Sequence, residues 1–533
     1  MHRPPHQPIS SAARPLDSSG SRRAALLAAV VCALVLVAGA CRPGSGPSER
    51  PSPHRGPILW ITIDALRADV LGAFGGDPEL TPNLDALAAE ADWAEPAVAP
   101  SSWTVPSMAS LFTGLQPFRH GNWHSGRTVL SAEHLTLPEA LQALGFQTAG
   151  FRSNTWLRQR SGYAQGFDQF SNLAQGGRAA AHIASLDGGP HLVWAHVLPP
   201  HAPYVLYPEL RDRLAGAPAE LPERINAKQL EPYFDPERDL PAELRDQAWA
   251  LYRSNVAHAD RVAGQLLDAL RQSGHWDDAL VIVTSDHGEE FGESGQVTHG
   301  GNLSRVLLEV PLIIKLPEGS RYRLRPRSWV ANARLFATVV ELCGGSPGAD
   351  VLPSLLSDVD PPALSELYLG NGINQVSLLV DGEQALWRAR FAPSEPRYYD
   401  ARLAGLGLAL ATPLEEEPAA IFGRLAAAFA ETPPLTGRPG DAVETTVRSW
   451  THPAGAGAPG GAELPGGERP PGRAGPRTGP PPVALIGALE REWLRWNGPE
   501  RPPREAAPMP RVELTPEERE ELEALGYVVE EDG

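Results

Sequence analysis

The chain has 533 residues, enough for one large globular domain with additional segments. Its 64 acidic residues outnumber its 46 basic residues, and the formal net charge of −18 argues against a nucleic-acid partner. This charge offers no general attraction for anionic substrates either, so any specificity for phosphate or sulfate has to come from a local site such as a metal ion.

The first 41 residues are predicted to lie outside the fold. Arg22 and Arg23 precede an apolar run over residues 24–40, whose last small residues lead directly to Cys41. This order is typical of an export signal, and it resembles a bacterial lipoprotein signal in which Cys41 is lipidated. An uncleaved membrane anchor is the alternative, and a twin-arginine signal is a weaker one. Each interpretation predicts a domain outside the cytoplasm, and the first two attach it to a membrane through an N-terminal lipid or helix.

Residues 42–56 are rich in Pro, Ser, Gly and Arg and are predicted to form a flexible tether. Beyond the signal segment only Cys343 is left, so no intramolecular disulfide is expected in the mature protein. The following core, residues 57–345, alternates apolar strands with helical segments, which predicts a mostly parallel sheet covered on both faces. Strands are expected over residues 58–63, 192–197, 279–285 and 311–316, and helices over residues 82–91, 137–144 and 247–271.

Two of these strands deliver side chains that can bind metal. The apolar run over residues 58–63 ends at Asp64, and the run over residues 279–285 ends at Asp286 and His287. Ligands of open α/β sheets bind at the carboxyl ends of parallel strands. We therefore expect these side chains to converge at one edge of the sheet.

Between these strands, a hydroxyl residue stands just ahead of a helix start. Thr104 precedes Pro106 and a run of small and apolar residues, and proline fits the first turn of a helix. The free amides and the dipole of a helix N-terminus favour negative charge, which lowers the cost of a threonine alkoxide and can hold an anion. A threonine that only caps the helix is the simpler interpretation for this segment alone.

Six short motifs follow one another in order from about residue 56 to about residue 317: Ile-Asp-Ala-Leu-Arg-Ala-Asp, Thr-Pro-Asn-Leu-Asp, Thr-Val-Pro-Ser, Pro-His-Ala-Pro-Tyr, Ser-Asp-His-Gly-Glu and His-Gly-Gly-Asn. This ordered set resembles the sulfatase family of the alkaline phosphatase superfamily. The resemblance implies an α/β/α sandwich with a small C-terminal antiparallel subdomain. It also implies a divalent metal bound by Asp64, Asp286, His287 and the oxygen of Thr104, with Thr104 as the nucleophile.

Three departures from the sulfatase pattern favour phosphate over sulfate esters. Sulfatases have Cys or Ser at the Thr104 position, which becomes formylglycine, and Arg at the Met108 position. The segment around Asn154 lacks the Lys and His with which sulfatases hold sulfate. His287 stands where calcium-binding sulfatases have Asn, and imidazole suits zinc or manganese better than calcium. Together these features resemble the threonine-nucleophile phosphodiesterases and phospho-headgroup transferases.

One metal ion is expected, because His299 is the only obvious further ligand for a second; a second metal ion is the alternative. His201 and His299 are therefore predicted to contact substrate or to protonate the leaving group, although either could be a structural histidine. Asn154 is predicted to donate to a phosphoryl oxygen, the alternative being an amide that orders its loop. Relatives often have Asp where this chain has Pro199 and His where it has Ser294, so two residues that could bind a second metal ion are missing here.

The remaining sequence is predicted to form three segments. Residues 346–430 form a C-terminal subdomain containing a β-hairpin around an Asp-Gly turn at residues 381–382. Residues 431–482 are rich in Pro, Gly, Ala and Arg and are expected to be disordered. Residues 483–533 form a helical tail, in which Thr515 begins a capping box.

Three functions are compatible with these residues. The favoured one is a metal-dependent hydrolase or phosphotransferase that acts on anionic phosphate mono- or diesters through a phospho-threonine at Thr104. A sulfuric ester hydrolase comes second. A catalytically impaired, surface-anchored binding protein is the third, motivated by Pro199, Ser294 and Met108. The sequence predicts no particular oligomeric state.

Overall fold

The computed structural model describes residues 51–122, 129–173, 176–234, 238–327, 329–348 and 351–358, together with four strands of a C-terminal sheet. The predicted signal or anchor segment (residues 1–41), residues 42–50 of the tether and the predicted tail (residues 483–533) lie outside the described residues. In the part of the chain that is described, no helix combines the length and the apolar character needed to cross a membrane.

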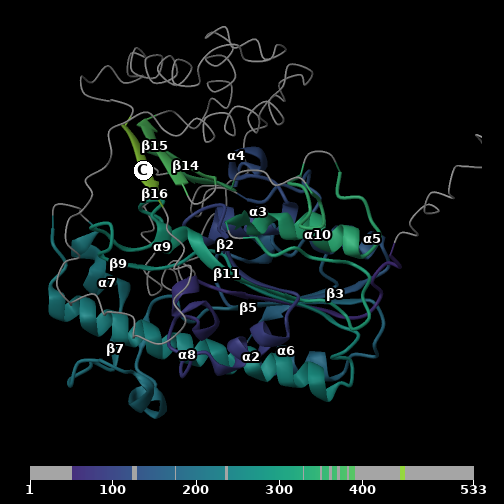
Figure 1. Cartoon of the computed structure of the whole chain (residues 1–533), viewed down its shortest axis with the longest axis horizontal. Helices are drawn as coiled ribbons and strands as arrows, with labels where there is room; N and C mark the ends of the chain where they lie inside the picture. Colours follow the sequence, from purple (N-terminus) through teal and green to yellow (C-terminus); the bar gives the residue numbers. More distant parts are fainter. Residues whose placement is uncertain are drawn as a thin grey trace, which may run out of the picture. The chain divides into compact units, whose positions relative to one another are not determined.

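A central sheet of eight strands forms the middle layer of the domain (Figure 1). Its strand order is β12-β2-β11-β8-β1-β5-β3-β4, and only β11 runs antiparallel to its neighbours. The inner strands are buried along their whole length, which explains why their sequences are almost continuously apolar. The strands are β1 (Ile58–Ile63), β2 (Trp93–Val98), β3 (Gln147–Arg152), β4 (Gln169–Asn172), β5 (His191–Val197), β8 (Leu280–Ser285), β11 (Glu309–Lys315) and β12 (Val330–Ala331).

Helices cover both faces of this sheet, as the alternation of elements predicts (Figure 1). Leu59 and Ile61 of β1 lie in one apolar cluster with the helices below the sheet in Figure 1, α2 (Pro82–Glu90), α6 (Gly177–Ala184) and α8 (Ala242–Gln272). Ile58 and Trp60 lie in the cluster of the opposite face with α3 (Thr104–Thr113), α5 (Leu137–Ala143) and α10 (Leu335–Leu342). Successive side chains of a strand point to opposite faces, so β1 contributes to both cores.

Shorter elements occupy the connections between these layers. They are α4 (Pro117–His120), α7 (Ala227–Leu230), α9 (Arg305–Leu308), β6 (Tyr204–Val205), β7 (Arg224–Ile225), β9 (Glu290–Phe291) and β10 (Val297–Thr298). Short segments of 3-10 helix are η1 (Ala68–Val70), η2 (Gly72–Phe74), η3 (Gln159–Ser161), η5 (Pro208–Arg213), η6 (Glu231–Tyr233) and η7 (Asn332–Arg334). The sequence predicted the long helix as residues 247–271, and α8 extends beyond both ends of that range.

A second, antiparallel sheet follows the core in the order β13-β14-β15-β16, with bounds β13 (Ala363–Tyr368), β14 (Ile373–Val380), β15 (Glu383–Arg390) and β16 (Glu444–Ser449). The predicted hairpin is confirmed, because Val380 of β14 pairs with Glu383 of β15. The prediction that residues 431–482 are disordered throughout is wrong at β16. That strand contains the β-branched run Thr-Thr-Val, which favours extended backbone.

The register of the sheet aligns the ends of its central strands. Ile63, the last residue of β1, pairs with Val197 of β5 on one side and with Ser285 of β8 on the other. The residues that follow β1 and β8, Asp64 and Asp286, therefore leave the sheet at the same level. This edge is the one at which the sequence predicted a ligand site.

Candidate functional site

The predicted nucleophile and metal ligands meet at this edge. Nε2 of His287 lies 3.2 Å from Oγ1 of Thr104, 3.3 Å from Oδ1 of Asp64 and 3.6 Å from Oδ2 of Asp286. Oγ1 of Thr104 lies 3.4 Å from Oδ1 of Asp64. All four side chains are fully buried. The convergence expected from the strand ends is therefore present, and Thr104 is the first residue of α3, as predicted.

Local backbone geometry turns Asp64 toward this centre. Ala65, the next residue, has a positive φ of 58°, which costs a residue with a side chain about 1–2 kcal/mol. Its amide donates to Oδ1 of Asp286, and its carbonyl accepts a hydrogen bond from the hydroxyl of Tyr252. The Ser285 hydroxyl donates to the carbonyl of Ile63, which ties the end of β8 to the end of β1. The strained turn is thus held on both sides.

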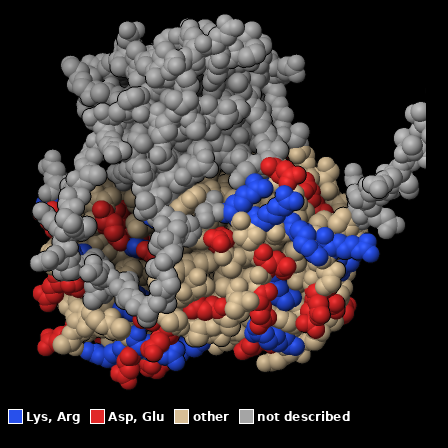
Figure 2. Space-filling model, in the orientation of Figure 1, with Lys and Arg blue, Asp and Glu red and all other residues tan. Residues whose placement is uncertain are grey.

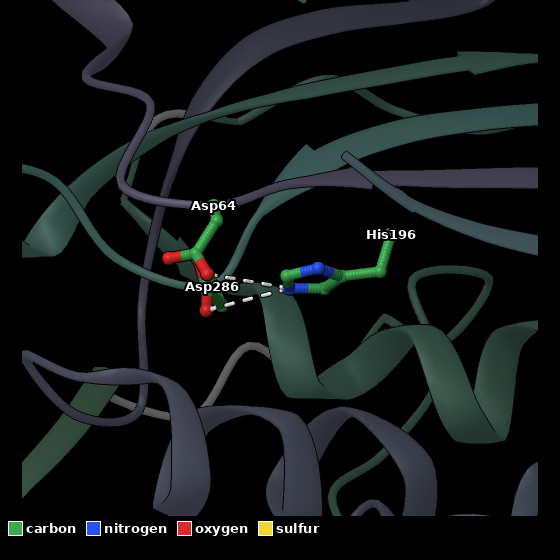
Figure 3. A group of neighbouring side chains, drawn as sticks. All are labelled: Asp64, His196 and Asp286. Carbon is green, nitrogen blue, oxygen red and sulfur yellow. Dashed lines mark ion pairs between the residues drawn. The ribbon is translucent and has the colours of Figure 1, made fainter. Parts of the chain in front are cut away.

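A further histidine, which the sequence analysis missed, points at the same carboxylates. His196, on β5, places Nε2 3.7 Å from Oδ2 of Asp64 and 4.0 Å from Oδ2 of Asp286 (Figure 3). Ligand atoms of these three residues lie within 4.8 Å of one another. The sequence did contain a signal for His196, because it is a polar residue one position before the end of an apolar strand. In the structure His196 pairs with Thr62 of β1, two residues before Asp64.

The geometry of the cluster fits a divalent metal ion. Separations of 3.2 to 4.0 Å are long for hydrogen bonds between charged groups. Ligands bound to zinc at about 2.0–2.2 Å lie roughly 3 to 4 Å from one another. Among the described residues, Oδ2 of Asp286 and both ring nitrogens of His196 have no hydrogen-bond partner although they are buried. An ion bound by Asp64, Asp286, His287, His196 and Thr104 would give a partner to Oδ2 of Asp286 and to Nε2 of His196.

The donor set also favours particular metals. Nδ1 of His287 donates to the carbonyl of Gly288, so Nε2 of a neutral His287 presents its lone pair to the centre. Two imidazoles beside two carboxylates suit zinc or manganese, whereas calcium prefers a set made up of oxygen atoms.

In the metal-free site the charges are arranged differently. Burial opposes the charge on His287, but Asp286 and Asp64 outweigh it and raise its pKa to about 9. Burial would likewise raise the pKa of Asp64, yet His201 and His287 hold it well below its usual range. Burial lowers the pKa of His201, so His201 loses its proton at a lower pH than His287, which then carries the positive charge beside Asp64. A metal ion would replace this proton.

A second group of side chains faces the metal cluster. The ring centroid of His299 lies 4.4 Å from that of His287 and 4.7 Å from that of His201. Nδ1 of His299 lies 2.8 Å from Oε1 of the buried Glu289, and Nδ1 of His201 lies 2.6 Å from the carbonyl of Ala202. Each histidine is thus held through Nδ1. The structure brings both predicted histidines to the site and adds Glu289, which the sequence analysis did not single out.

Asn154 also lies at the centre. Its Nδ2 donates to Oδ2 of Asp64 at 2.7 Å and to Oγ1 of Thr104 at 3.4 Å, while its Oδ1 accepts from the amide of Trp156. The amide is therefore oriented by its own loop and contacts the nucleophile. Met108, one turn further along α3, is fully buried in the apolar cluster, so no charged side chain replaces the sulfatase arginine at this position.

Comparison with known families agrees with this arrangement. The Sulfatase family model matches residues 57–185 and 177–345, which together make up more than half of the chain. The chain belongs to the sulfatase family. Its matched region begins just before β1 and ends just after α10, so it includes every residue placed in the site above.

Individual relatives are distant. The multifunctional alkaline phosphatase superfamily protein PehA of Trinickia caryophylli is 26% identical over 413 residues, covering 58% of this chain and 79% of PehA. Human N-sulphoglucosamine sulphohydrolase is 27% identical over 337 residues, covering 58% of this chain and 62% of the human protein. The crystal structure of a phosphonate monoester hydrolase of Agrobacterium radiobacter has the same fold, with a TM-score of 0.51 and 19% identity over 71% of this chain and 96% of that one.

Proposed function

We propose that this sulfatase-family chain is an exported, membrane-tethered, metal-dependent hydrolase or phosphotransferase that acts on anionic phosphate mono- or diesters through Thr104. The observation that carries the proposal is the position of Thr104 Oγ1, at the start of α3 and within 3.4 Å of both Asp64 and His287. The amides of a helix N-terminus favour an anionic group at this point. When bound, a divalent ion supplies positive charge that lowers the pKa of the hydroxyl and neutralises charge developing on the substrate.

The side chains support a two-step transfer. Thr104 Oγ1 forms a bond to phosphorus while the bond to the ester oxygen breaks, and Asp64 Oδ1 is placed to receive the hydroxyl proton. The departing oxygen takes a proton from His299 or His201. Water or an alcohol then attacks phosphorus and gives its proton to the same histidine, while the bond between phosphorus and the Thr104 oxygen breaks and Thr104 takes its proton back from Asp64. Asn154 orients both Asp64 and Thr104 during this cycle.

His299 is the better candidate for the leaving-group acid. Its Nδ1 faces the carboxyl group of Glu289, which can stabilise an imidazolium, whereas Nδ1 of His201 faces a neutral carbonyl. Burial and the charge of His287 lower the pKa of His299 to about 3 when no substrate is bound. Burial also raises the pKa of Glu289 to about 7, which keeps a proton close by. An ester dianion beside His299 would raise its pKa and allow it to carry that proton.

Two features favour phosphate over sulfate. Threonine cannot be converted to the formylglycine of sulfatases, and Met108 belongs to the apolar core. The relationship to PehA, whose name describes a multifunctional member of the superfamily, is compatible with this choice. A sulfuric ester hydrolase is the second candidate, because several relatives are named as sulfatases. A binding protein without turnover is the third.

One experiment separates these functions. The purified protein is loaded with zinc, manganese or calcium and assayed on phosphate mono- and diesters, phosphonates and aryl sulfates. Reactions are quenched in acid and digested, and mass spectrometry locates any adduct. We expect zinc- or manganese-dependent turnover of a phosphate ester and a phosphoryl group on Thr104. Faster turnover of aryl sulfates would favour the second candidate, and protein without turnover or bound metal would favour the third.

A further inference from the structure

Arg67 belongs to the motif that follows β1, but the proposed transfer steps do not involve it. Charged side chains of both signs lie on the surface drawn in Figure 2, whereas the Arg67 side chain is only 6% exposed. Its guanidinium group forms ion pairs with two carboxylates, those of Asp69 and Glu293. A guanidinium group is buried at low cost only where such partners replace its water, so the positions of Arg67 and its partners depend on one another.

The Arg67 side chain joins the segment after β1 to the hairpin formed by β9 and β10. Nε and Nη2 donate to the two carboxylate oxygens of Asp69, at 2.9 and 2.6 Å. Nη1 donates to the carbonyl of Glu289 at 3.2 Å and also to Oε1 of Glu293. Oε2 of Glu293 accepts from the amide of Phe291, which closes the connection on the side of the hairpin. All three guanidinium nitrogens are thus used, an arrangement that the single ammonium group of a lysine cannot reproduce.

This hairpin carries the group that is proposed to protonate the leaving oxygen. Glu289 directly precedes β9 and His299 directly follows β10, and the two strands pair with each other. A shift of β9 therefore moves His299 as well as Glu289. On the other side of His299, the amide of Gly300 donates to the carbonyl of Ser102, two residues before Thr104. The position of the hairpin thus sets how His299 faces the nucleophile.

The metal half of the site is held by other contacts. The carbonyl of His287 accepts a hydrogen bond from the hydroxyl of Ser285. The amide of Gly288 donates to the carbonyl of Leu307 at 2.8 Å. Replacing the side chain of Arg67 removes neither of these hydrogen bonds. A displacement of the hairpin can therefore begin after Gly288 and leave His287 in place.

We infer that Arg67 is a positioning residue, which holds the hairpin of β9 and β10 so that Glu289 and His299 face Thr104. The inference rests on the proposed function, because it concerns the same transfer. Arg67 acts through these two residues and does not itself move a proton. Misplacing a positioned group by about 1 Å can cost about 10²-fold in rate. The loss of Arg67 should therefore appear in proton transfer to the leaving oxygen and not in metal binding.

The test compares Arg67→Lys with a matched control, Arg253→Lys. Arg253 of α8 is similarly buried, with 9% of its side chain exposed, and donates to the carbonyl of Ala215 and to the carboxylate of Asp77. Lysine keeps the positive charge in both variants but cannot bridge several acceptors. Turnover is measured on esters with alkyl and with nitrophenolate leaving groups. Each variant is made in the wild-type protein and in the His299→Gln background.

We expect Arg67→Lys to lower the turnover of alkyl esters at least about tenfold and that of nitrophenyl esters less than about threefold. The loss should disappear in the His299→Gln background, because effects of residues that act through one another are not additive. Metal affinity should not change, and Arg253→Lys should not distinguish the two leaving groups. Glu293→Gln, at a partly exposed partner, should show the same pattern more weakly and replaces Arg67→Lys if that variant does not fold.

A loss in Arg67→Lys that is independent of the leaving group would overturn the inference. An equal loss in the wild-type and His299→Gln backgrounds would also overturn it, since Arg67 would then act by another route.

Nuclear magnetic resonance of protein with isotope-labelled histidine gives a readout that needs no turnover. The ring nitrogen signals of His299 are assigned by their absence from His299→Gln. They should shift in Arg67→Lys and stay in place in Arg253→Lys. Such a shift in a protein that hydrolyses none of the esters would refute the proposed function alone. Unchanged His299 signals in an active Arg67→Lys protein would refute only the positioning role.

Discussion

Two neighbouring histidines of the site bind a proton with very different affinity. The rings of His287 and His299 are 4.4 Å apart, and both are fully or almost fully buried. The two carboxylates beside His287 raise its pKa to about 9, whereas burial and the charge of His287 lower the pKa of His299 to about 3. Residue type and burial are the same, so the difference comes from the number and position of the neighbouring charges.

The comparison suggests a division of labour around Thr104. The half formed by Asp64, Asp286, His196 and His287 has the excess of negative charge that a cation requires. In the half formed by His201, His299 and Glu289, burial disfavours the charged form of each group, and an anionic substrate would raise the pKa of the histidines. Substitutions in one half should therefore reveal whether the other half responds.

Thr104→Ala should have the largest effect, because it removes the group between the two halves. Turnover should fall by several orders of magnitude, as for other deleted nucleophiles. Metal content should persist, since the two Asp and two His ligands are unchanged, and the fold should lose no more than about 1–2 kcal/mol of stability. Steady-state kinetics, elemental analysis and thermal unfolding measure the three quantities. Thr104→Ser is the control and should keep measurable activity, and near-normal turnover of the Ala variant would disprove the nucleophile assignment.

His299→Gln should lower turnover by roughly 10²–10⁴ for esters with poor, alkyl leaving groups. Esters with a nitrophenolate leaving group should be affected little, because that group departs without a proton. Glu289→Gln should show the same dependence on the leaving group, but a smaller effect, because it acts through His299. Kinetics on a series of leaving groups test this, with His201→Gln as the matched variant. A loss independent of the leaving group would instead indicate that His299 only binds substrate.

His196→Gln should weaken metal binding by about 10–100-fold, with a smaller change in turnover at saturating metal. The loss of a nitrogen ligand should also alter the electron paramagnetic resonance spectrum of the manganese-loaded protein. Competition with a chelator measures the affinity. An unchanged affinity and spectrum would show that His196 supports the carboxylates without binding the ion.

Much of this site could be predicted from sequence, and what was missed has a physical reason. Asp64, Asp286 and His287 were found because each ends an apolar strand, which places it at a sheet edge without any knowledge of packing. His196 lies inside a strand, and its contact with Asp64 depends on which strands are neighbours. Glu289 was missed because its partner, His299, lies on the other side of the hairpin formed by β9 and β10. The mostly parallel sheet could be predicted because apolar strands alternate with helical segments along the chain. The strand β16 was missed because it forms by pairing with β15, which lies far away in the sequence.

Metal uptake should release a proton near neutral pH. The proton on His287, with its pKa of about 9, has to leave before Nε2 can bind an ion. The apparent metal affinity should therefore rise about tenfold per pH unit between pH 7 and pH 9. Calorimetry in buffers of different ionisation enthalpy counts the released protons. His287→Asn should release none, and equal proton release by the variant would contradict the assignment.

The same raised pKa predicts how the stability of the metal-free protein depends on pH. The folded state binds the His287 proton more tightly than the unfolded state, in which the pKa of the histidine is 6.5. The resulting stabilisation is complete below pH 6.5 and is lost as the pH rises through about 9. Chemical unfolding of the chelated protein across this range should show the loss, and His287→Asn should remove this part of the pH dependence.

Ala65→Gly should have the smallest effect, and it asks whether the strained turn itself maintains the metal half. Glycine relieves the cost of the positive φ, about 1–2 kcal/mol, but it gives the unfolded chain more freedom and removes a buried methyl group. These contributions are similar in size and opposite in sign, so the free energy of unfolding should change by no more than about 1 kcal/mol. The Ala65 amide still donates to Asp286 in the variant, because glycine keeps that group. Metal affinity should therefore stay within a few-fold of wild type.

Ala65→Val is the contrasting variant, since a β-branched residue is disfavoured at this φ, and it should be clearly destabilised. If glycine weakened metal binding without changing stability, the smaller backbone freedom of alanine, and not the hydrogen bonds alone, would be needed to position Asp64.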